Sequence, residues 1–245
     1  MSDLFLLRSK DRTSASSSSH NFRLDLQGSL IEPGSYNVEF INMQNSIYTI
    51  RSAVNDVIYF NENSTNKTAT ITAGYYTEST LPTAVKSTLD TASGGFATFT
   101  VTISASTKKM TIASTQNFSL KFATNTSPTY PSAAKTLGYA NTDTSAATSQ
   151  VGTSIVNLAD PLSVSIRIRQ ASSKGFNCVN GAHGQILVPL DVGFGYLKAY
   201  KTDDFPQTLT FNNKANVLDI ELRDLEGFYL DLNGSEFEML LRRIN

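Results

Sequence analysis

The residues of this chain that could carry chemistry are few and widely separated. Two histidines, His20 and His183, and one cysteine, Cys178, are the only imidazole and thiol side chains in 245 residues. Neither histidine has a second ligand residue at the spacing of a metal site. A single thiol without an activating neighbour is a structural or idle group. We therefore expect no catalytic residue, no cofactor, no metal ligand and no enzyme activity.

Three short motifs imitate ligand-binding loops without completing the pattern. The segments that begin at Asp224 and Asp231 resemble calcium loops, but they lack the alternating ligands and the closing glutamate in register. Gly193-Phe194-Gly195 lacks the third glycine and the following helix of a dinucleotide site. We interpret all three segments as turns.

Carboxylate pairs and net charge give no better support for an activity. Asp203 and Asp204 adjoin each other, and Glu236 and Glu238 alternate, which is typical of a solvated surface rather than of a glycosidase pair. The net charge is −1, from 20 basic and 21 acidic residues, so the whole chain has no electrostatic attraction for nucleic acid or membranes. We expect partners to be recognised by shape, with no nucleic-acid specificity.

The N-terminal segment and the cysteine content bear on the cellular compartment. Leu4 to Leu7 form a run of only four apolar residues, too short for a signal peptide or a membrane span. One cysteine excludes an intramolecular disulfide framework and suits a reducing cytosol. We therefore expect a protein without a membrane span that assembles in the cytoplasm.

Short alternating β-strands occupy both ends of the chain. The clearest covers 217–223, where Leu218, Ile220 and Leu222 point to one face and the charged residues between them point to the other. Pro189 lies within another such pattern, which indicates an edge strand or a bulge. Whether 47–50 is a strand of its own stays open. The pattern predicts strands at 22–26, at 36–40 with a continuation at 43–48 after a bend, and at 56–60 as the fourth candidate. After the middle block it predicts strands at 163–169, 186–190, 209–211, 217–223 and 237–244.

The middle block has a different, Ser/Thr-rich texture. The spacing of Leu81, Val85 and Leu89 predicts a helix from about residue 80 to 89, with Thr80 as its cap and Pro82 in its first turn. A helical turn at 132–137 should end at Gly138 in the left-handed conformation. Together with strands near 68–72, 96–103, 108–112 and 117–122, these elements predict a small α+β unit.

These elements define an expected domain plan. Residues 1–20 form an N-terminal arm, residues 21–64 and 160–245 the two halves of one sandwich, and residues 65–159 an inserted domain. The fold class is mainly β: a single eight-stranded sandwich with a small α+β domain between its fourth and fifth strands. Leu4 to Leu7 in the arm form either an extra edge strand or a segment that docks on a neighbour.

Several segments follow one another in a characteristic order along the chain: Ser9-Lys10-Asp11-Arg12, Asn21-Phe22, 36–43, Gly74-Tyr75-Tyr76-Thr77, Leu137-Gly138-Tyr139, 218–227 and 230–238. Together they resemble the penton, or vertex capsid, proteins of virophages, Polinton-like viruses and related large DNA viruses. The resemblance implies a jelly roll, five copies that close each vertex of an icosahedral virion, and an inserted domain on the outside. It implies assembly with hexamer-like capsomers of a major capsid protein and a location at the capsid vertex.

Three functions remain open at this point. The first is a structural capsid protein that forms a homopentamer. The second is a minor capsid or host-attachment protein, in which the inserted domain binds a receptor or a glycan. The third is an enzyme, which would need a catalytic cluster that the sequence does not contain.

Overall fold

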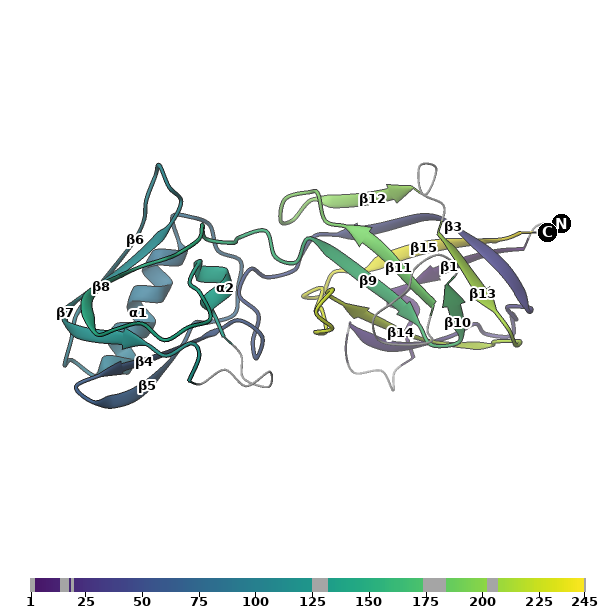
Figure 1. Cartoon of the computed structure of the whole chain (residues 1–245). Helices are drawn as coiled ribbons and strands as arrows, with labels where there is room; N and C mark the ends of the chain where they lie inside the picture. The colour runs from purple at the N-terminus through teal and green to yellow at the C-terminus, as the bar shows by residue number, and fades with distance from the viewer. Residues whose placement is uncertain are drawn as a thin grey trace. The chain divides into compact units, whose positions relative to one another are not determined.

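The chain forms two compact units (Figure 1). The computed structural model describes residues 3–13, 18, 20–124, 132–173, 184–201 and 207–244. The first unit, which we call the sandwich unit, comprises Met1–Ile47 and Pro161–Asn245. The second, the inserted unit, comprises Tyr48–Asp160. Each unit buries a hydrophobic cluster of its own.

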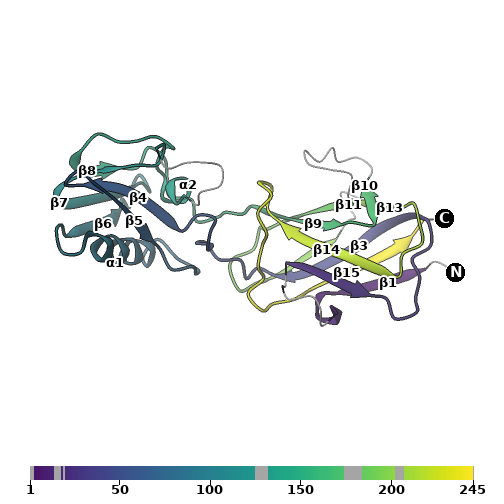
Figure 2. The ribbon, with the colours of Figure 1, turned by 90° about the horizontal axis from the view of Figure 1, so that it is seen from below.

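Two antiparallel sheets form the sandwich unit, and Figures 1 and 2 show them lying one over the other. The six-stranded sheet has the order β1-β15-β3-β13-β10, and β12 also pairs with β3. The four-stranded sheet has the order β11-β9-β14-β2. A 3-10 turn, η1 (Ser9–Asp11), follows β1. The strands are β1 (Leu4–Arg8), β2 (Asn21–Asp25), β3 (Gly34–Gln44), β9 (Ser163–Ile168), β10 (Ala171–Ser173), β11 (Gly184–Pro189), β12 (Leu197–Lys201), β13 (Thr208–Phe211), β14 (Val217–Arg223) and β15 (Phe237–Arg243).

The core of the sandwich unit follows from alternation along its strands. Leu218, Ile220 and Leu222 on β14 are fully buried, as the sequence predicts, and each contributes about 1.5–3 kcal/mol by leaving water. From the other sheet, Val38 and Met239 belong to the same cluster. Side chains of both sheets thus share one core, so the unit is a β-sandwich.

The N-terminal segment belongs to this sandwich. All five residues of β1 pair with β15, from Leu4 with Arg242 to Arg8 with Glu238. Leu7 is buried in the core, with 2% of its surface exposed. Of the two alternatives for Leu4 to Leu7, the edge strand is therefore the correct one.

The inserted unit is an α+β domain. Its sheet has the order β5-β4-β7-β6, and β8 also pairs with β7. The buried face of α1 consists of Leu81, Val85 and Leu89, as the spacing predicts, and joins the core of this unit. The elements are β4 (Val57–Glu62), β5 (Thr65–Thr70), α1 (Leu81–Ser93), β6 (Phe99–Ile103), β7 (Met110–Leu120), α2 (Ala134–Leu137) and β8 (Ala147–Val151).

The ends of the two helices differ in how well the sequence predicts them. Gly138 ends α2 with φ 80°, the predicted left-handed cap. Thr80 precedes α1 but makes no side-chain cap; its hydroxyl instead accepts a hydrogen bond from the Thr77 amide at 2.9 Å. The predicted cap is therefore corrected, because an upstream turn engages the Thr80 side chain.

The pairing of β4 corrects the expected domain boundary at residues 64 and 65. The segment 56–60 was expected as the fourth sandwich strand, yet β4 pairs with β5 and β7 of the inserted unit. Among the described strands, the insertion therefore follows the third strand, β3, and not the fourth. Alternation predicts that a segment is a strand but does not say which strand it joins. Ile50, left open above, forms only an isolated bridge with Gly74.

Candidate assembly surfaces

Of the residues that could carry chemistry, His20 is held in place by packing and a backbone hydrogen bond. Its ring lies 5.2 Å from the ring of Tyr229, and its backbone carbonyl accepts a hydrogen bond from the Leu222 amide at 2.7 Å. Its Nδ1 is buried without a hydrogen-bond partner among the described residues. Cys178, His183, Asp203 and Asp204 lie outside the described residues.

The calcium-like and glycine segments are turns. Asp224 Oδ1 accepts a hydrogen bond from the Phe228 amide at 2.8 Å, and Asp231 Oδ1 accepts one from the Asn233 amide at 2.9 Å. Gly195 has φ 85° and is followed by β12 rather than by a helix. The side chains of both aspartates thus close their own loops, which is the ordinary use of Asp in turns.

The outer face of the six-stranded sheet carries apolar side chains. Leu6 pairs with Leu240, and Leu240 pairs with Phe40, so three outward side chains form a row across β1, β15 and β3. We call these three residues the apolar row. Leu6 is 49% exposed and the neighbouring Leu4 is 58% exposed, while Phe40 and Leu240 are half-buried. A contiguous exposed apolar patch of this kind is a mark of an interaction surface.

Glu238 lies beside the apolar row and has no charged partner among the residues that the structure describes. Glu238 lies on the same outward face of β15, opposite Arg8 on β1 and Asn42 on β3. Arg8 is bound to Asp11 at 2.7 Å and not to Glu238. Within the described ranges, no hydrogen bond or ion pair involves the Glu238 carboxylate.

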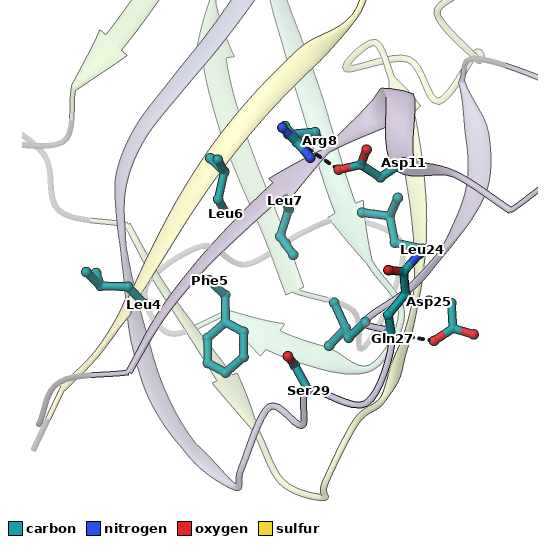
Figure 3. Close-up of a pocket in the computed structure, with 11 residues that line it drawn as sticks. Leu4, Phe5, Leu6, Leu7, Arg8, Asp11, Leu24, Asp25, Gln27 and Ser29 are labelled. Atoms are coloured by element: carbon teal, nitrogen blue, oxygen red, sulfur yellow. Dashed lines mark hydrogen bonds and ion pairs between the residues drawn. The ribbon is translucent and has the colours of Figure 1, made fainter.

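A groove of about 320 Å³ runs between the free side of β1 and the chain at β2 (Figure 3). Phe5 and Leu7 point into it, whereas Leu4 and Leu6 point away from it. The ion pair between Arg8 and Asp11 lies along its edge. The lining residues are Leu4–Arg8, Asp11, Leu24–Gln27 and Ser29, which include no histidine, cysteine or tyrosine.

The outer face of the four-stranded sheet is rich in arginine. Glu221 accepts a hydrogen bond from Arg223 Nε at 2.8 Å and forms an ion pair with Arg169 at 3.4 Å. Arg167 lies directly across from Glu221 on β9, and its Nε is buried without a hydrogen-bond partner among the residues described. Arg223 also stacks on the ring of Tyr229, with 3.8 Å between the guanidinium carbon and the ring centre. Three guanidinium groups thus surround one carboxylate.

The same face lowers the pKa of two carboxyl groups. The hydrogen bond from Arg23, at 2.8 Å, lowers the pKa of Asp219, and Gln170 adds a second hydrogen bond. Burial by itself raises the pKa of Glu221, but the hydrogen bonds and charges of Arg223 and Arg169 outweigh it, so this pKa too lies below its ordinary value. We call Arg23, Arg167, Arg169, Asp219, Glu221 and Arg223 the arginine face.

The inserted unit has a surface groove of about 460 Å³. Its lining residues include Asn141, Asn157 and Ile155, and Ile155 is 61% exposed. The tyrosine Tyr139 also lines it; burial raises the pKa of its hydroxyl, which donates a hydrogen bond to the Gln150 carbonyl at 3.0 Å. The groove thus combines polar and apolar side chains.

In the described part of the chain, no group of three or more His, Cys, Asp and Glu side chains is placed to hold a metal ion. Likewise, no described helix has the length and apolar character needed to cross a membrane.

The apolar row and the arginine face were not predicted from the sequence. A bulge between Leu240 and Leu241 shifts the register against β3, so Phe40 turns outward although it follows Val38 by two residues. The available signal was the unbroken run of apolar residues from Leu4 to Leu7, because such a run places apolar side chains on both faces of a strand.

Solved structures include chains that are similar in fold to this protein. Comparisons of the sequence with family models and with curated proteins find no match. The structure is similar to the crystal structure of the selenomethionine-labelled mavirus penton protein, with a TM-score of 0.50 and 11% sequence identity. The similarity covers 99% of each chain. It is a similarity of fold.

Proposed function

We propose that this protein is a structural capsid protein that forms the homopentameric penton at the five-fold vertices of an icosahedral virion. The end-to-end similarity to the mavirus penton protein, over 99% of both chains, carries the proposal, because it includes the inserted unit as well as the sandwich. A fold alone does not determine function. The resemblance of the sequence segments quoted above points independently to the same class of protein.

The strand order supports an eight-stranded jelly roll as the sandwich of this penton. Counting β12 and β13 as one broken strand, because they pair with successive parts of β3, gives β1, β15, β3 and β13 in one sheet, to which the three-residue β10 adds a short edge strand. The other sheet supplies β11, β9, β14 and β2. Two four-stranded layers with this strand order are typical of a jelly roll.

We also propose partners and a location for the pentamer. The pentamer would contact hexamer-like capsomers of a major capsid protein, lie at the capsid vertex, and assemble in the host cytoplasm. One cysteine and a net charge of −1 suit a cytosolic assembly that depends on shape. We propose no catalytic role for the chain.

Electron micrographs of the purified full chain test the pentamer. We expect two-dimensional class averages of ring particles with five-fold symmetry at high protein concentration. Particles with only two-fold symmetry, or only single subunits, would contradict the proposal.

A second candidate is host attachment through the inserted unit, as part of a penton or of a minor capsid protein. The observation that favours it is the groove of about 460 Å³, where amides and a 61% exposed Ile155 lie together on a unit with its own core. Binding of the full chain to a glycan array would test it. We expect Asn157→Ala to abolish any binding, and unchanged binding by this variant would place the contact elsewhere.

A further inference from the structure

A closed ring of identical subunits places a geometric demand on each subunit. Cyclic rings of more than two copies use heterologous contacts, in which two different surfaces of the chain meet. The two outer faces of the sandwich unit are such a pair. One carries the apolar row and the other carries the arginine face.

The first surface is suited to burial but carries a negative charge, Glu238, for which the described part of the chain supplies no partner. The half-buried Phe40 and Leu240 and the 49% exposed Leu6 present apolar area that gains free energy by leaving water. Glu238 lies on the next outward position of β15, two residues from Leu240. A partner that covers this surface must supply a cation for Glu238, because an unpaired carboxylate is costly to bury.

The second surface has cations in excess. Glu221 and Asp219 are the carboxylates among the six residues of the arginine face, against four guanidinium groups. Arg23 is bound to Asp219, and Arg223 and Arg169 are bound to Glu221. Arg167 is left with a buried Nε that has no partner within the described ranges. Arginine is the cation best suited to pair with a carboxylate across a contact.

We propose that the apolar row of one copy packs against the arginine face of a second copy of this chain, with Glu238 of the first meeting Arg167 of the second. This inference rests on the proposed pentamer and names the surfaces that join its subunits. The apolar stems of the arginines and the Tyr229 ring, which is 39% exposed, give the arginine face apolar area to set against the apolar row. The charge complementarity fixes which face meets which.

Charge reversal in the full chain tests the contact. Glu238→Arg and Arg167→Glu are made singly and together, and the mass of each protein is followed by light scattering over a dilution series. We expect each single variant to need at least tenfold more protein than the wild type for half-association, and the double variant to recover most of that loss. Leu6→Gln should also weaken association, since it removes apolar area from an exposed position.

Lys214→Glu is the matched control, because Lys214 lies in the turn between β13 and β14 and forms an exposed ion pair with Glu32. It should associate like the wild type. Thermal melting of every variant shows that the sandwich unit is folded.

The outcomes separate this inference from the function on which it rests. A wild-type pentamer that is unaffected by both single variants, or single losses that the double variant does not recover, would overturn the contact while leaving the penton function in place. A wild-type protein that forms no pentamer would contradict the penton function, and the proposed contact would fall with it. A two-fold dimer would also overturn the contact, since the same face would then meet itself.

Discussion

At the scale of single residues, the alternation of β14 separates two kinds of position. Ile220 is fully buried between the sheets, whereas Glu221 faces outward and accepts a hydrogen bond from Arg223. The first kind of position determines stability, and the second determines how the outer face is charged.

Substitution of Ile220 tests the inward face. Ile220→Asp would bury a carboxylate without a partner and should lower the free energy of unfolding by about 3–5 kcal/mol. Ile220→Val, the matched control, should cost only about 0.5–1.5 kcal/mol. Urea unfolding measures both. Equal midpoints for the two variants would show that Ile220 does not line the core.

The lowered pKa values of Asp219 and Glu221 predict a dependence of stability on pH. Below the ordinary pKa of a carboxyl group, about 4, the unfolded chain binds protons that the native carboxylates still exclude. Their contribution is therefore present above that pH and is lost as the pH falls through the lower native pKa values. The melting temperature of the sandwich unit should fall between pH 5 and pH 2 more steeply in the wild type than in Asp219→Asn/Glu221→Gln, by a few degrees. Parallel curves would contradict this prediction.

At the scale of elements, two glycines end the two helices of the inserted unit in the same conformation but in different surroundings. Gly94 has φ 65° and open space where a Cβ would lie, while a Cβ on Gly138, with φ 80°, would lie 2.5 Å from the Ser154 carbonyl oxygen. The sequence predicts the left-handed cap at Gly138. Only the structure shows that the second is closely covered by the chain at 154–155.

Alanine at these two caps should therefore have unequal effects. Gly94→Ala should cost about 1 kcal/mol, the strain of a left-handed alanine. Gly138→Ala adds a clash with backbone atoms and should cost about 3 kcal/mol or more. Thermal unfolding of the inserted unit provides the comparison, and a similar loss for both variants would show that the close approach at Gly138 is relieved without cost.

Elements with strong local patterns were predictable from the sequence, and their pairing was not. The alternation of 217–223 and the spacing of Leu81, Val85 and Leu89 predicted β14 and the buried face of α1. Pro189 was predicted at an edge, and β11 is an edge strand. In contrast, Leu4 to Leu7 join β15, more than 230 positions away in the chain, which no local pattern specifies. The apolar row depends on that same long-range pairing.

At the scale of the whole molecule, an ion pair joins the first and last segments of the inserted unit. Arg51 Nη2 lies 3.3 Å from Asp160 Oδ2, although the two residues are 109 positions apart. Both belong to the inserted unit, as does β4 with the fully buried Ile58 and Phe60. The unit therefore contains everything needed for its own sheet.

The inserted unit should fold alone when it is excised at the structural boundaries, 48–160, and should not fold when it is excised at the boundaries expected from the sequence, 65–159. A fragment of residues 48–160 should unfold cooperatively on heating, because it keeps β4 and the ion pair of Arg51 with Asp160. A fragment of residues 65–159 lacks β4 and should show no cooperative transition. Circular dichroism on both fragments decides the boundary, and a cooperative transition of the shorter fragment alone would refute it.

The central claim is that five copies of this chain form one particle. Light scattering coupled to size exclusion measures the mass of the full chain directly over a range of concentrations. We expect a species with five times the 26.7 kDa of one chain, and its share of the total protein should rise with concentration. A mass of 26.7 kDa at every concentration, together with no pentamer in assembled shells, would contradict it.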